Sequence, residues 1–445
     1  MTRREWLCAA AAPAVSAARA ARPNIVLILA DDLGSRDLSS YGSPDIRTPA
    51  IDSIGRRGVR FTQFYSSGPE CSPTRTALLT GRYQQRAGGL ECAIGVGDQG
   101  RYDDAVWLQQ RGELGLPASE ITLPRILKRA GYDTGCFGKW HLGYPKKFWP
   151  AAHGFDESFG ILGGNADYFK HTEDDGRAVL YRNRGLVERK GYSTDLFAEA
   201  AIDWLKRRGG KPFFLYLPFT TPHTPIQDPD GFDPDTGTAP TRQGDRKIYA
   251  KMVERMDARV NDVLAQLDRM GRTEDTIVLF LSDNGGDPNG DNTPLRGRKS
   301  SVWEGGIRVP CMLRWLRLGI EGRTTRQVGL AMDLLPTLLA AAGVAPPAGR
   351  KFDGVDLLAV IRGERKPFAR TVFWRYRRAE VTRKAVREGD LKLVDDNGKR
   401  ELHDLAADPL EQRDLLAAMP DRAAKLDALL SAWEKDVRAP RLVRR

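Results

Sequence analysis

The sequence predicts an α/β protein: a large, mixed but mostly parallel sheet sandwiched by helices, followed by a smaller α+β domain with a short antiparallel sheet. Continuous apolar runs at residues 23–30, 212–218 and 276–282 have the length and composition of strands buried on both faces of such a sheet. Beyond residue 365 the pattern changes to short alternating strands and a terminal helix, which indicates the second domain.

The composition is typical of a soluble globular chain long enough for two or three domains. Of its 445 residues, 41% are hydrophobic and 29% are charged. The formal net charge of +11 favours anionic partners. Because no helix-turn-helix, zinc-finger or RNA-binding motif occurs, we expect an anionic substrate and no nucleic acid. No apolar run reaches the roughly 20 residues that a membrane helix needs, so no membrane span is expected.

Residues 1–20 have the features of a signal peptide. Arg3 and Arg4 precede an Ala-rich stretch, and the segment ends in Ala-Arg-Ala, a small-x-small cleavage site. The start is similar to a twin-arginine signal, although a general secretory signal stays open. We therefore expect an exported, periplasmic or secreted protein.

The five cysteines do not indicate a disulfide framework. Cys8 lies in the expected signal and Cys71 is a candidate nucleophile, which leaves Cys92, Cys136 and Cys311. Three cysteines cannot all pair within one chain, and their spacing matches no zinc site.

The first buried strand ends in two adjacent acids, Asp31 and Asp32. Buried neighbouring carboxylates are costly unless a cation compensates them, and open α/β sheets bind ligands at this end of their strands. The run at residues 276–282 ends similarly in Asp283 and Asn284. Each strand end alone could be a solvated turn. Together they offer the oxygen ligands that calcium or magnesium takes.

The segment 67–83 contains the candidate nucleophile. Cys71 or Ser72 is placed to cap a short helix, with Pro73 in its first turn and Gly81 just after its end. Arg75 then lies one turn further on the same face. The free N–H groups, the helix dipole and the guanidinium would all face residue 71, which makes an anion site with a nucleophile in it. A structural cysteine is the alternative.

Short helices are expected at residues 48–58 and 122–131, each followed by a strand. After the second strand, Lys139 and His141 are two residues apart, so in extended chain they share a face and could bind one anion. A surface lysine and a packed histidine are the alternative. The segment 95–100 matches G-x-G-x-x-G, but no strand precedes it and no amphipathic helix follows it, so dinucleotide binding is rejected.

Residues 159–171 form a Gly- and aromatic-rich segment that we expect to be a substrate-facing loop. Asp167, Tyr168 and His171 are its candidates for contacting substrate, although an ordinary loop is slightly favoured. His223 stands between two prolines after the apolar run 212–218, so its ring projects from extended chain at a strand end. Amphipathic helices are expected at residues 194–208 and 249–270.

Lys299 and Glu304 occur in a Lys-x-x-x-x-Glu-Gly-Gly segment. A helix at residues 333–342 and a Pro/Gly-rich linker at 343–354 follow. We therefore place a catalytic domain at 21–364 and a small domain at 365–445. A basic run in the small domain is either a solvated face or a wall for a polyanion: Arg375, Arg377, Arg378, Arg383 and Lys384.

Three motifs occur together in a familiar order: Cys-Ser-Pro-Thr-Arg from Cys71, Gly-Lys-Trp-His-Leu-Gly from Gly138, and the Lys299 segment. Over residues 22–415 the chain resembles the formylglycine-dependent sulfatases of the alkaline-phosphatase superfamily, including arylsulfatases and N-acetylgalactosamine-6-sulfatase types. The resemblance implies an alkaline-phosphatase-like fold and hydrolysis of a sulfate monoester, on a sulfated glycan or small molecule. It also implies that a formylglycine-generating enzyme oxidises Cys71 to formylglycine (3-oxoalanine), whose hydrate is the nucleophile.

The resemblance also assigns roles to residues. Calcium, or magnesium, would be held by Asp31, Asp32, Asp283, Asn284 and the formylglycine made from Cys71. Formylglycine and sulfate would be bound by Arg75, Lys139 and Lys299, while His141 would serve the elimination step and His223 would protonate the leaving alcohol.

Two other functions stay open. A phosphodiesterase or phosphonate monoester hydrolase of the same superfamily can also use formylglycine. A non-catalytic binder of sulfated glycans could use the basic surface, but it would not need a precursor nucleophile.

Overall fold

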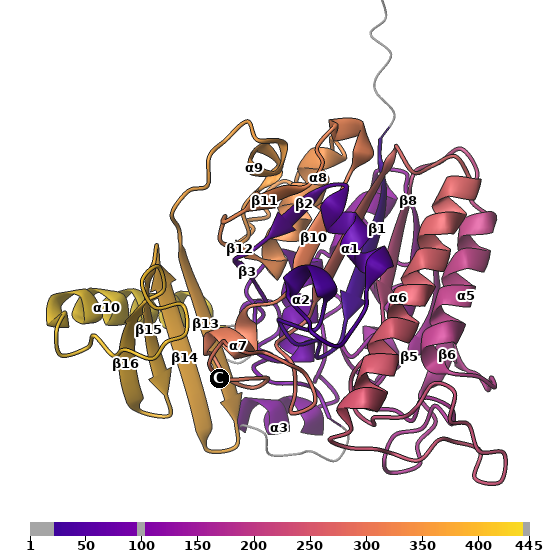
Figure 1. Cartoon of the computed structure of the whole chain (residues 1–445), viewed down its shortest axis with the longest axis horizontal. Helices are drawn as coiled ribbons and strands as arrows, with labels where there is room; N and C mark the ends of the chain where they lie inside the picture. Colours follow the sequence, from indigo (N-terminus) through magenta and orange to yellow (C-terminus); the bar gives the residue numbers. More distant parts are fainter. Residues whose placement is uncertain (1–21, 96–102, 439–445) are drawn as a thin grey trace, which may run out of the picture.

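The computed structural model describes residues 22–95 and 103–438, and it consists of one large α/β body with a small sheet at its side (Figure 1). The expected signal peptide and nearly all of the G-x-G-x-x-G segment lie outside the described residues. In the part of the chain that is described, no helix combines the length and apolar character needed to cross a membrane.

The large sheet has ten strands in the order β11-β2-β10-β9-β1-β8-β4-β5-β6-β7. The three strands predicted from apolar runs are neighbours at its centre: β1 (Asn24–Ala30) pairs in parallel with both β8 (Phe213–Pro218) and β9 (Thr276–Ser282). Their side chains are buried throughout, which explains why these segments are apolar without alternation.

The sheet extends in both directions from this centre. On one side β4 (Asp133–Lys139) and β5 (Glu157–Ile161) continue in parallel. On the other side β10 (Cys311–Arg314) is antiparallel to β9. The remaining short strands are β2 (Val59–Phe61), β6 (Leu180–Arg182), β7 (Gly185–Leu186) and β11 (Arg323–Thr325), with β3 (Phe64–Tyr65) and β12 (Gly329–Leu330) as a separate pair.

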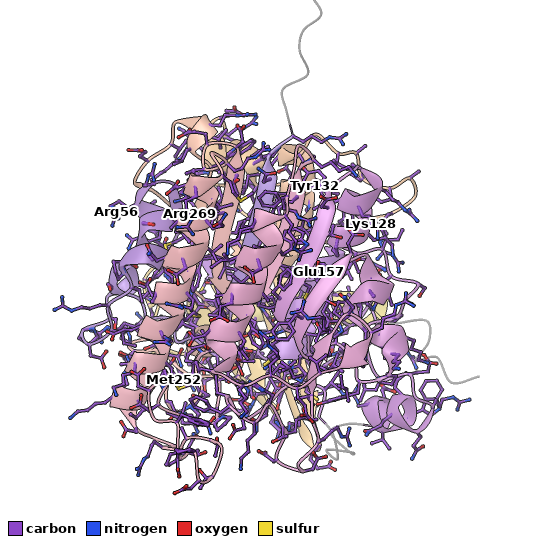
Figure 2. The ribbon with its side chains drawn as sticks, turned by 90° about the vertical axis from the view of Figure 1, so that its right-hand side faces the viewer. Arg56, Lys128, Tyr132, Glu157, Met252 and Arg269 are labelled. Carbon is purple, nitrogen blue, oxygen red and sulfur yellow. The ribbon has the colours of Figure 1, made fainter. Side chains whose placement is uncertain are left out.

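Helices cover both faces of the sheet. One hydrophobic core includes Val26 and Ile28 of β1 and is covered by α1 (Pro49–Arg56), α5 (Ser193–Lys206) and α6 (Arg246–Arg269). Figure 2 looks onto this layer, with Met252 and Arg269 marking α6. The opposite core includes Ile25 and Leu27 and is covered by four helices: α2 (Cys71–Thr80), α4 (Leu123–Arg129), α8 (Leu334–Ala341) and α9 (Leu358–Arg362).

The C-terminal part is a four-stranded antiparallel sheet packed against one helix. Its strands are β13 (Thr371–Arg378), β14 (Val381–Glu388), β15 (Leu391–Asp396) and β16 (Lys399–Asp404), and α10 (Pro420–Asp436) lies against β14 and β15. It lies beside α7 (Glu304–Ile307) in Figure 1. Trp374 of β13 shares a hydrophobic core with Tyr65 and Trp303 of the large body, so the two parts are packed together.

The fold class is as predicted, and several individual elements differ from the prediction: β16, α7 and α9 were not foreseen. The first residues of the expected loop 159–171 belong to β5. Gly160 interrupts the run of strand-forming side chains there, so the sequence did not predict this strand. Gly160 packs so closely on β4 that a Cβ there would lie 1.8 Å from the carbonyl oxygen of Gly138. The structure also contains α3 (Asp103–Gln110), which was not predicted, and single turns at Ser39–Tyr41, Lys146–Phe148, Pro150–His153, Leu316–Leu318 and Ala331–Asp333.

Candidate functional site

The polar ends of β1 and β9 meet at one edge of the large sheet. Ala30 pairs with Ser282, so the residues that follow them are brought side by side. The Asp32 N–H donates to Asp283 Oδ1 at 3.3 Å, and Asn284 Nδ2 donates to Asp32 Oδ1 at 2.7 Å. The grouping of oxygen ligands expected from the two strand ends is therefore present.

Backbone conformation at the site is unusual. Asp32 has φ +62°, His141 has φ +54° and Ser300, next to Lys299, has φ +69°. Residues other than glycine rarely adopt this left-handed region, and such strain is concentrated where side chains must be aimed precisely at a ligand.

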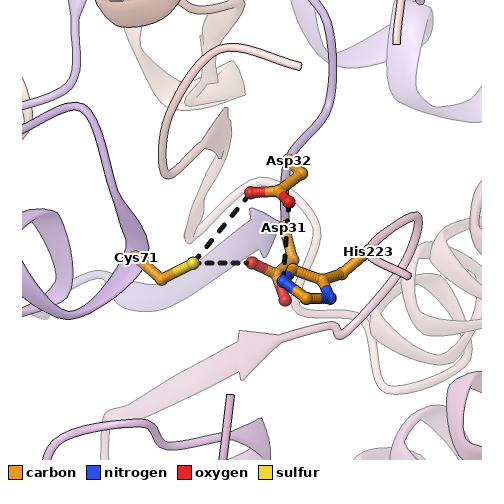
Figure 3. A group of neighbouring side chains, drawn as sticks. All are labelled: Asp31, Asp32, Cys71 and His223. Atoms are coloured by element: carbon orange, nitrogen blue, oxygen red, sulfur yellow. Dashed lines mark hydrogen bonds and ion pairs between the residues drawn. The ribbon is translucent and has the colours of Figure 1, made fainter. Parts of the chain in front are cut away.

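Helix α2 places Cys71 beside these acids. The helix ends before Gly81, whose φ of +67° suits glycine, as expected. It begins at Cys71, and its N-cap is Glu70 rather than the predicted Cys71 or Ser72. All ten of its residues are buried. Cys71 Sγ lies 3.4 Å from Asp31 Oδ1 and 4.0 Å from Asp32 Oδ1 (Figure 3).

The Arg75 guanidinium holds the Asp283 carboxylate in place by hydrogen bonds. Its Nε and Nη2 donate to Asp283 Oδ2 at 2.9 and 2.7 Å, and Nη1 donates to the Lys139 carbonyl at 2.8 Å. Arg75 Nη2 also lies 3.5 Å from Asp31 Oδ1. Sequence reasoning expected the guanidinium to face residue 71, but its recorded hydrogen bonds go to Asp283 and the Lys139 backbone.

Two lysines from distant segments flank the acids. Lys139 Nζ, at the end of β4, lies 2.5 Å from Asp31 Oδ2 and 3.6 Å from Cys71 Sγ. Lys299 Nζ lies 2.6 Å from Asp32 Oδ2 and 3.2 Å from His223 Nε2. Each lysine can therefore donate to an anion held next to residue 71.

The two histidines are held as neutral rings with defined tautomers. His223 Nδ1 is 2.6 Å from the Thr224 carbonyl oxygen, which can only accept, so Nδ1 carries the proton and Nε2 is free to accept. Burial, with the nearby positive charge of Lys139 and Lys299, lowers the pKa of His223 to about 3. His141 donates from Nε2 to the Ile94 carbonyl, and burial holds its pKa well below the usual value.

The surroundings also shift the pKa values of Asp283, Asp32 and Cys71. Burial raises the pKa of Asp283 to about 6, with help from the negative charge of Asp31. The pKa of Asp32 is lowered because Lys299 and His223 outweigh the effect of burial. Burial raises the pKa of the Cys71 thiol well above its usual value. An unmodified Cys71 is therefore protonated at neutral pH, and a thiol is a poor nucleophile compared with a thiolate.

The donor atoms suit a hard divalent cation. Ligand atoms of Asp31, Asp32, Cys71 and His223 all lie within 4.8 Å of one another. Asn284 Oδ1 is buried and has no hydrogen-bond partner, so it is an oxygen donor left available. Carboxylate and amide oxygens, here grouped at two strand ends, are the ligands that calcium and magnesium prefer.

A pocket of about 340 Å³ opens over this group. Buried Cys71, His141 and His223 line it, together with the half-buried Lys299. Its wall includes Arg378 of the predicted basic run and residues that the sequence did not single out: Tyr144, Asn165, Glu173, Asp174 and Asp175. The run of acids before Gly176 was the signal available in the sequence for this wall.

Asp167 and His171 are not among the residues that line this pocket. Asp167 accepts hydrogen bonds from the backbone of Phe169 and Lys170 and from Gln227 Nε2 at 2.8 Å. His171 Nε2 is 3.1 Å from the Gly191 carbonyl oxygen. Both side chains shape the loop, and the pocket wall is formed by their neighbours.

The basic run of the small domain is largely ion-paired. Arg375 pairs with Glu91 and Glu434, and Lys384 pairs with Glu434 at 3.1 Å. Within this run only Arg378 is among the described residues that line the pocket. Cys71, Cys136 and Cys311 are free thiols.

Comparison with known proteins agrees with this geometry. The Sulfatase family model matches residues 23–344, and the model for N-sulphoglucosamine sulphohydrolase, C-terminal, matches 298–435. The chain is 36% identical over 360 residues to N-acetylgalactosamine-6-sulfatase of Canis lupus familiaris, covering 77% of this chain and 66% of that protein. The Homo sapiens protein of the same name is 34% identical, with 76% and 66% covered.

The chain thus spans slightly less than two thirds of the length of these curated relatives. Among solved structures, Ps i-CgsB in complex with k-i-k-neocarrahexaose superposes with a TM-score of 0.83 at 29% identity, covering 94% of both chains. This likeness confirms the predicted fold class. The Sulfatase model covers well over half of the chain and extends from β1 through Asp31, Cys71 and Lys299 to the end of α8. The chain therefore belongs to the sulfatase family.

Proposed function

We propose that this chain hydrolyses a sulfate monoester, with the sulfate bound next to residue 71. The observation that carries the proposal is the position of Cys71 at the buried end of a pocket, between Lys139 and the Asp31–Asp32 pair. Membership of the sulfatase family supports it.

The charges of the site suit this substrate. Three buried carboxylates, of Asp31, Asp32 and Asp283, face three cationic groups, of Arg75, Lys139 and Lys299. A bound divalent cation would leave an excess of positive charge, which attracts an anionic ester and stabilises charge on the transferring group. We propose calcium, with magnesium as the alternative, held by Asp31, Asp32, Asp283 and Asn284.

We further propose that Cys71 is converted to formylglycine by a formylglycine-generating enzyme. The hydrated aldehyde supplies two hydroxyls on one carbon, one to attack sulfur and one to allow release of sulfate. The high pKa of the buried thiol supports this, because the unmodified side chain is unsuited to attack. Arg75 keeps the carboxylates in place around residue 71.

The remaining side chains handle the sulfate and the protons. Lys139 and Lys299 donate to sulfate oxygens from two sides. His141 donates its Nε2–H to the Ile94 carbonyl oxygen, so its unpartnered Nδ1 can accept a proton from a hydroxyl in the pocket. His223 Nε2 can deliver a proton to the leaving alcohol. The ring is neutral without ligand, and an anion bound beside it favours the protonated form.

The substrate class is a sulfated carbohydrate in this proposal. Curated relatives include N-acetylgalactosamine-6-sulfatases, and Ps i-CgsB was solved in complex with k-i-k-neocarrahexaose, which supports a sugar. We also propose that residues 21–364 form the catalytic domain, that 365–445 form the small domain, and that the protein is exported.

The test uses protein produced with and without a formylglycine-generating enzyme. The mass of the tryptic peptide Phe61–Arg75 should match the aldehyde only in the first preparation, and only that preparation should hydrolyse 4-nitrophenyl sulfate. Faster turnover of an aryl phosphodiester or phosphonate monoester would replace the proposal with the related hydrolase. Equal turnover by the two preparations would contradict the role of formylglycine.

A further inference from the structure

The pocket continues from residue 71 to a polar wall formed mainly by the loop between β5 and β6. Asn165 and Glu173 belong to this loop, and Tyr144 lies next to them on the wall. These residues lie beyond the groups assigned to sulfate, metal and proton transfer. They are placed where the alcohol part of the ester would lie.

Two oxygen atoms on this wall have no hydrogen-bond partner among the described residues. Glu173 Oε1 accepts from the Tyr144 hydroxyl at 2.5 Å, and Oε2 is left unpaired. Asn165 Nδ2 donates to Asp174 Oδ2 at 3.1 Å, and its Oδ1 is left unpaired. A carboxylate only accepts, so the contact with Asp174 fixes the amide orientation and leaves Oδ1 as the available atom. Both available groups are therefore acceptors.

The backbone holds these acceptors close to the reacting groups. A Cβ at Gly163 would lie 1.7 Å from Glu173 Oε1, and a Cβ at Gly164 would lie 2.5 Å from the His141 ring. The Gly-Gly pair thus allows Glu173 and His141 to pack against adjacent points of one loop. His141 is 3% exposed and its Nδ1 is also unpartnered. A ligand that reaches His141 also reaches the wall.

Shielded acceptors without donors are unfavourable, and a ligand that supplies the donors relieves this cost. The free hydroxyls of a sugar ring are such donors. The pocket volume of about 340 Å³ is at the lower end of the range for small-molecule sites, which suits one sugar unit. Four acids line this wall, and two of them have a cation beside them: Arg378 lies 3.6 Å from Glu70 and Arg177 lies 3.5 Å from Asp175. The excess of negative charge, on Glu173 and Asp174, would repel a second sulfate.

We propose that Asn165 and Glu173 recognise the sugar by accepting hydrogen bonds from unsulfated hydroxyls of the unit whose sulfate is removed, and that this unit carries one sulfate only. This inference rests on the proposed sulfatase function. It assigns Asn165 and Glu173 to specificity and gives them no part in bond cleavage.

The test compares two substrates on each variant of the formylglycine-containing protein. One is the best monosulfated methyl hexoside of a panel, and the other is 4-nitrophenyl sulfate, which has no hydroxyls for the wall. Glu173→Gln keeps the size of the side chain but removes its charge. We expect the ratio of sugar to aryl kcat/KM to fall about 10-fold or more, chiefly through KM. The matched control is Glu188→Gln, the same change at an exposed residue that is not among those lining the pocket.

An unchanged ratio in Glu173→Gln would overturn the inference while leaving the sulfatase function in place. A protein that hydrolyses neither substrate would instead remove the function on which the inference rests. A second measurement needs no variant: the wild-type protein should hydrolyse the monosulfated hexoside faster than its disulfated counterpart. Isothermal titration of the unconverted Cys71 protein should show the same order of affinity, and a preference for the disulfated sugar would overturn the inference.

Discussion

Glu304 and Lys392 form a fully buried ion pair that joins the Lys299 segment to the small C-terminal sheet. Lys392 Nζ of β15 lies 2.9 Å from Glu304 Oε1 and 2.8 Å from Glu411 Oε1. The Tyr65 hydroxyl donates to Glu304 Oε2 at 2.7 Å. Glu304 is the acid of the Lys-x-x-x-x-Glu-Gly-Gly segment, so its partner fixes the loop that carries Lys299. The small domain thus helps to build the site.

We expect Lys392→Met to destabilise the protein by about 3–5 kcal/mol, because it leaves two buried carboxylates without their cation. The kcat/KM for 4-nitrophenyl sulfate should also fall at temperatures well below unfolding, since the Lys299 loop loses its anchor. Lys399→Met is the matched control: its side chain is 76% exposed and pairs only at the surface. Wild-type activity in folded Lys392→Met would show that the pair does not position the loop.

Cys71→Ala should lower kcat by at least about 1,000-fold with little loss of stability, because it removes the precursor of the nucleophile. The measurement is turnover of 4-nitrophenyl sulfate together with a thermal unfolding curve. Cys136→Ala provides the opposite control, because this buried cysteine lies in β4 and is not among the pocket residues. It should cost about 1–3 kcal/mol of stability and keep turnover. Substantial turnover by Cys71→Ala would contradict the mechanism.

Removal of divalent cations should lower both activity and the thermal midpoint. A chelator leaves the buried carboxylates of Asp31, Asp32 and Asp283 close together at the strand ends without their cation. A bound ion stabilises the folded state by mass action, by about 2.7 kcal/mol at an ion concentration 100 times Kd. Adding Ca²⁺ should restore both readouts.

The control for this experiment is Asp32→Asn, which weakens the ligand set with little change in size. Its midpoint should respond much less to Ca²⁺ than that of the wild-type protein. An equal response in the two proteins would place the ion elsewhere.

The sequence was informative where the signal is local. Apolar runs followed by Asp31 and Asp283 predicted buried strands with oxygen-rich ends, because parallel strands end on the same side of a sheet. Gly81 marked the end of α2 because a left-handed residue after a helix is a local signal, whereas the N-cap is Glu70, one residue before the predicted Cys71 or Ser72.

The sequence was less informative where partners are distant. Asp167 was the acid selected from its loop, but its carboxylate accepts a hydrogen bond from Gln227, 60 positions away. Glu173 of the same loop lines the pocket. No local pattern could pair Lys392 with Glu304 across 88 positions. The hydrogen-bond partner of Arg75 was not predictable for the same reason, since Asp283 is 208 positions away.

Asp257 gives a prediction about pH that is independent of the metal site. In α6 it accepts hydrogen bonds from the N–H groups of Ala50 and Ile51 at 3.2 and 2.7 Å, so it caps the start of α1 from another helix. Burial raises its pKa from 3.8 to about 6 despite these bonds. Between these values the folded protein holds a proton that the unfolded chain has lost.

The stabilisation from protonated Asp257 is therefore complete below about pH 4 and is lost as the pH rises through about 6. Asp257→Asn cannot titrate at this position. We expect the free energy of unfolding of the variant, minus that of the wild-type protein, to increase between pH 4 and 7 and to level off above. Urea titrations of both proteins at each pH provide this difference, in which the contributions of the other titrating groups largely cancel. A difference that stays constant or decreases over this range would mean that Asp257 is ionised in the folded protein at pH 4, and that its bonds to α1 outweigh the cost of its burial.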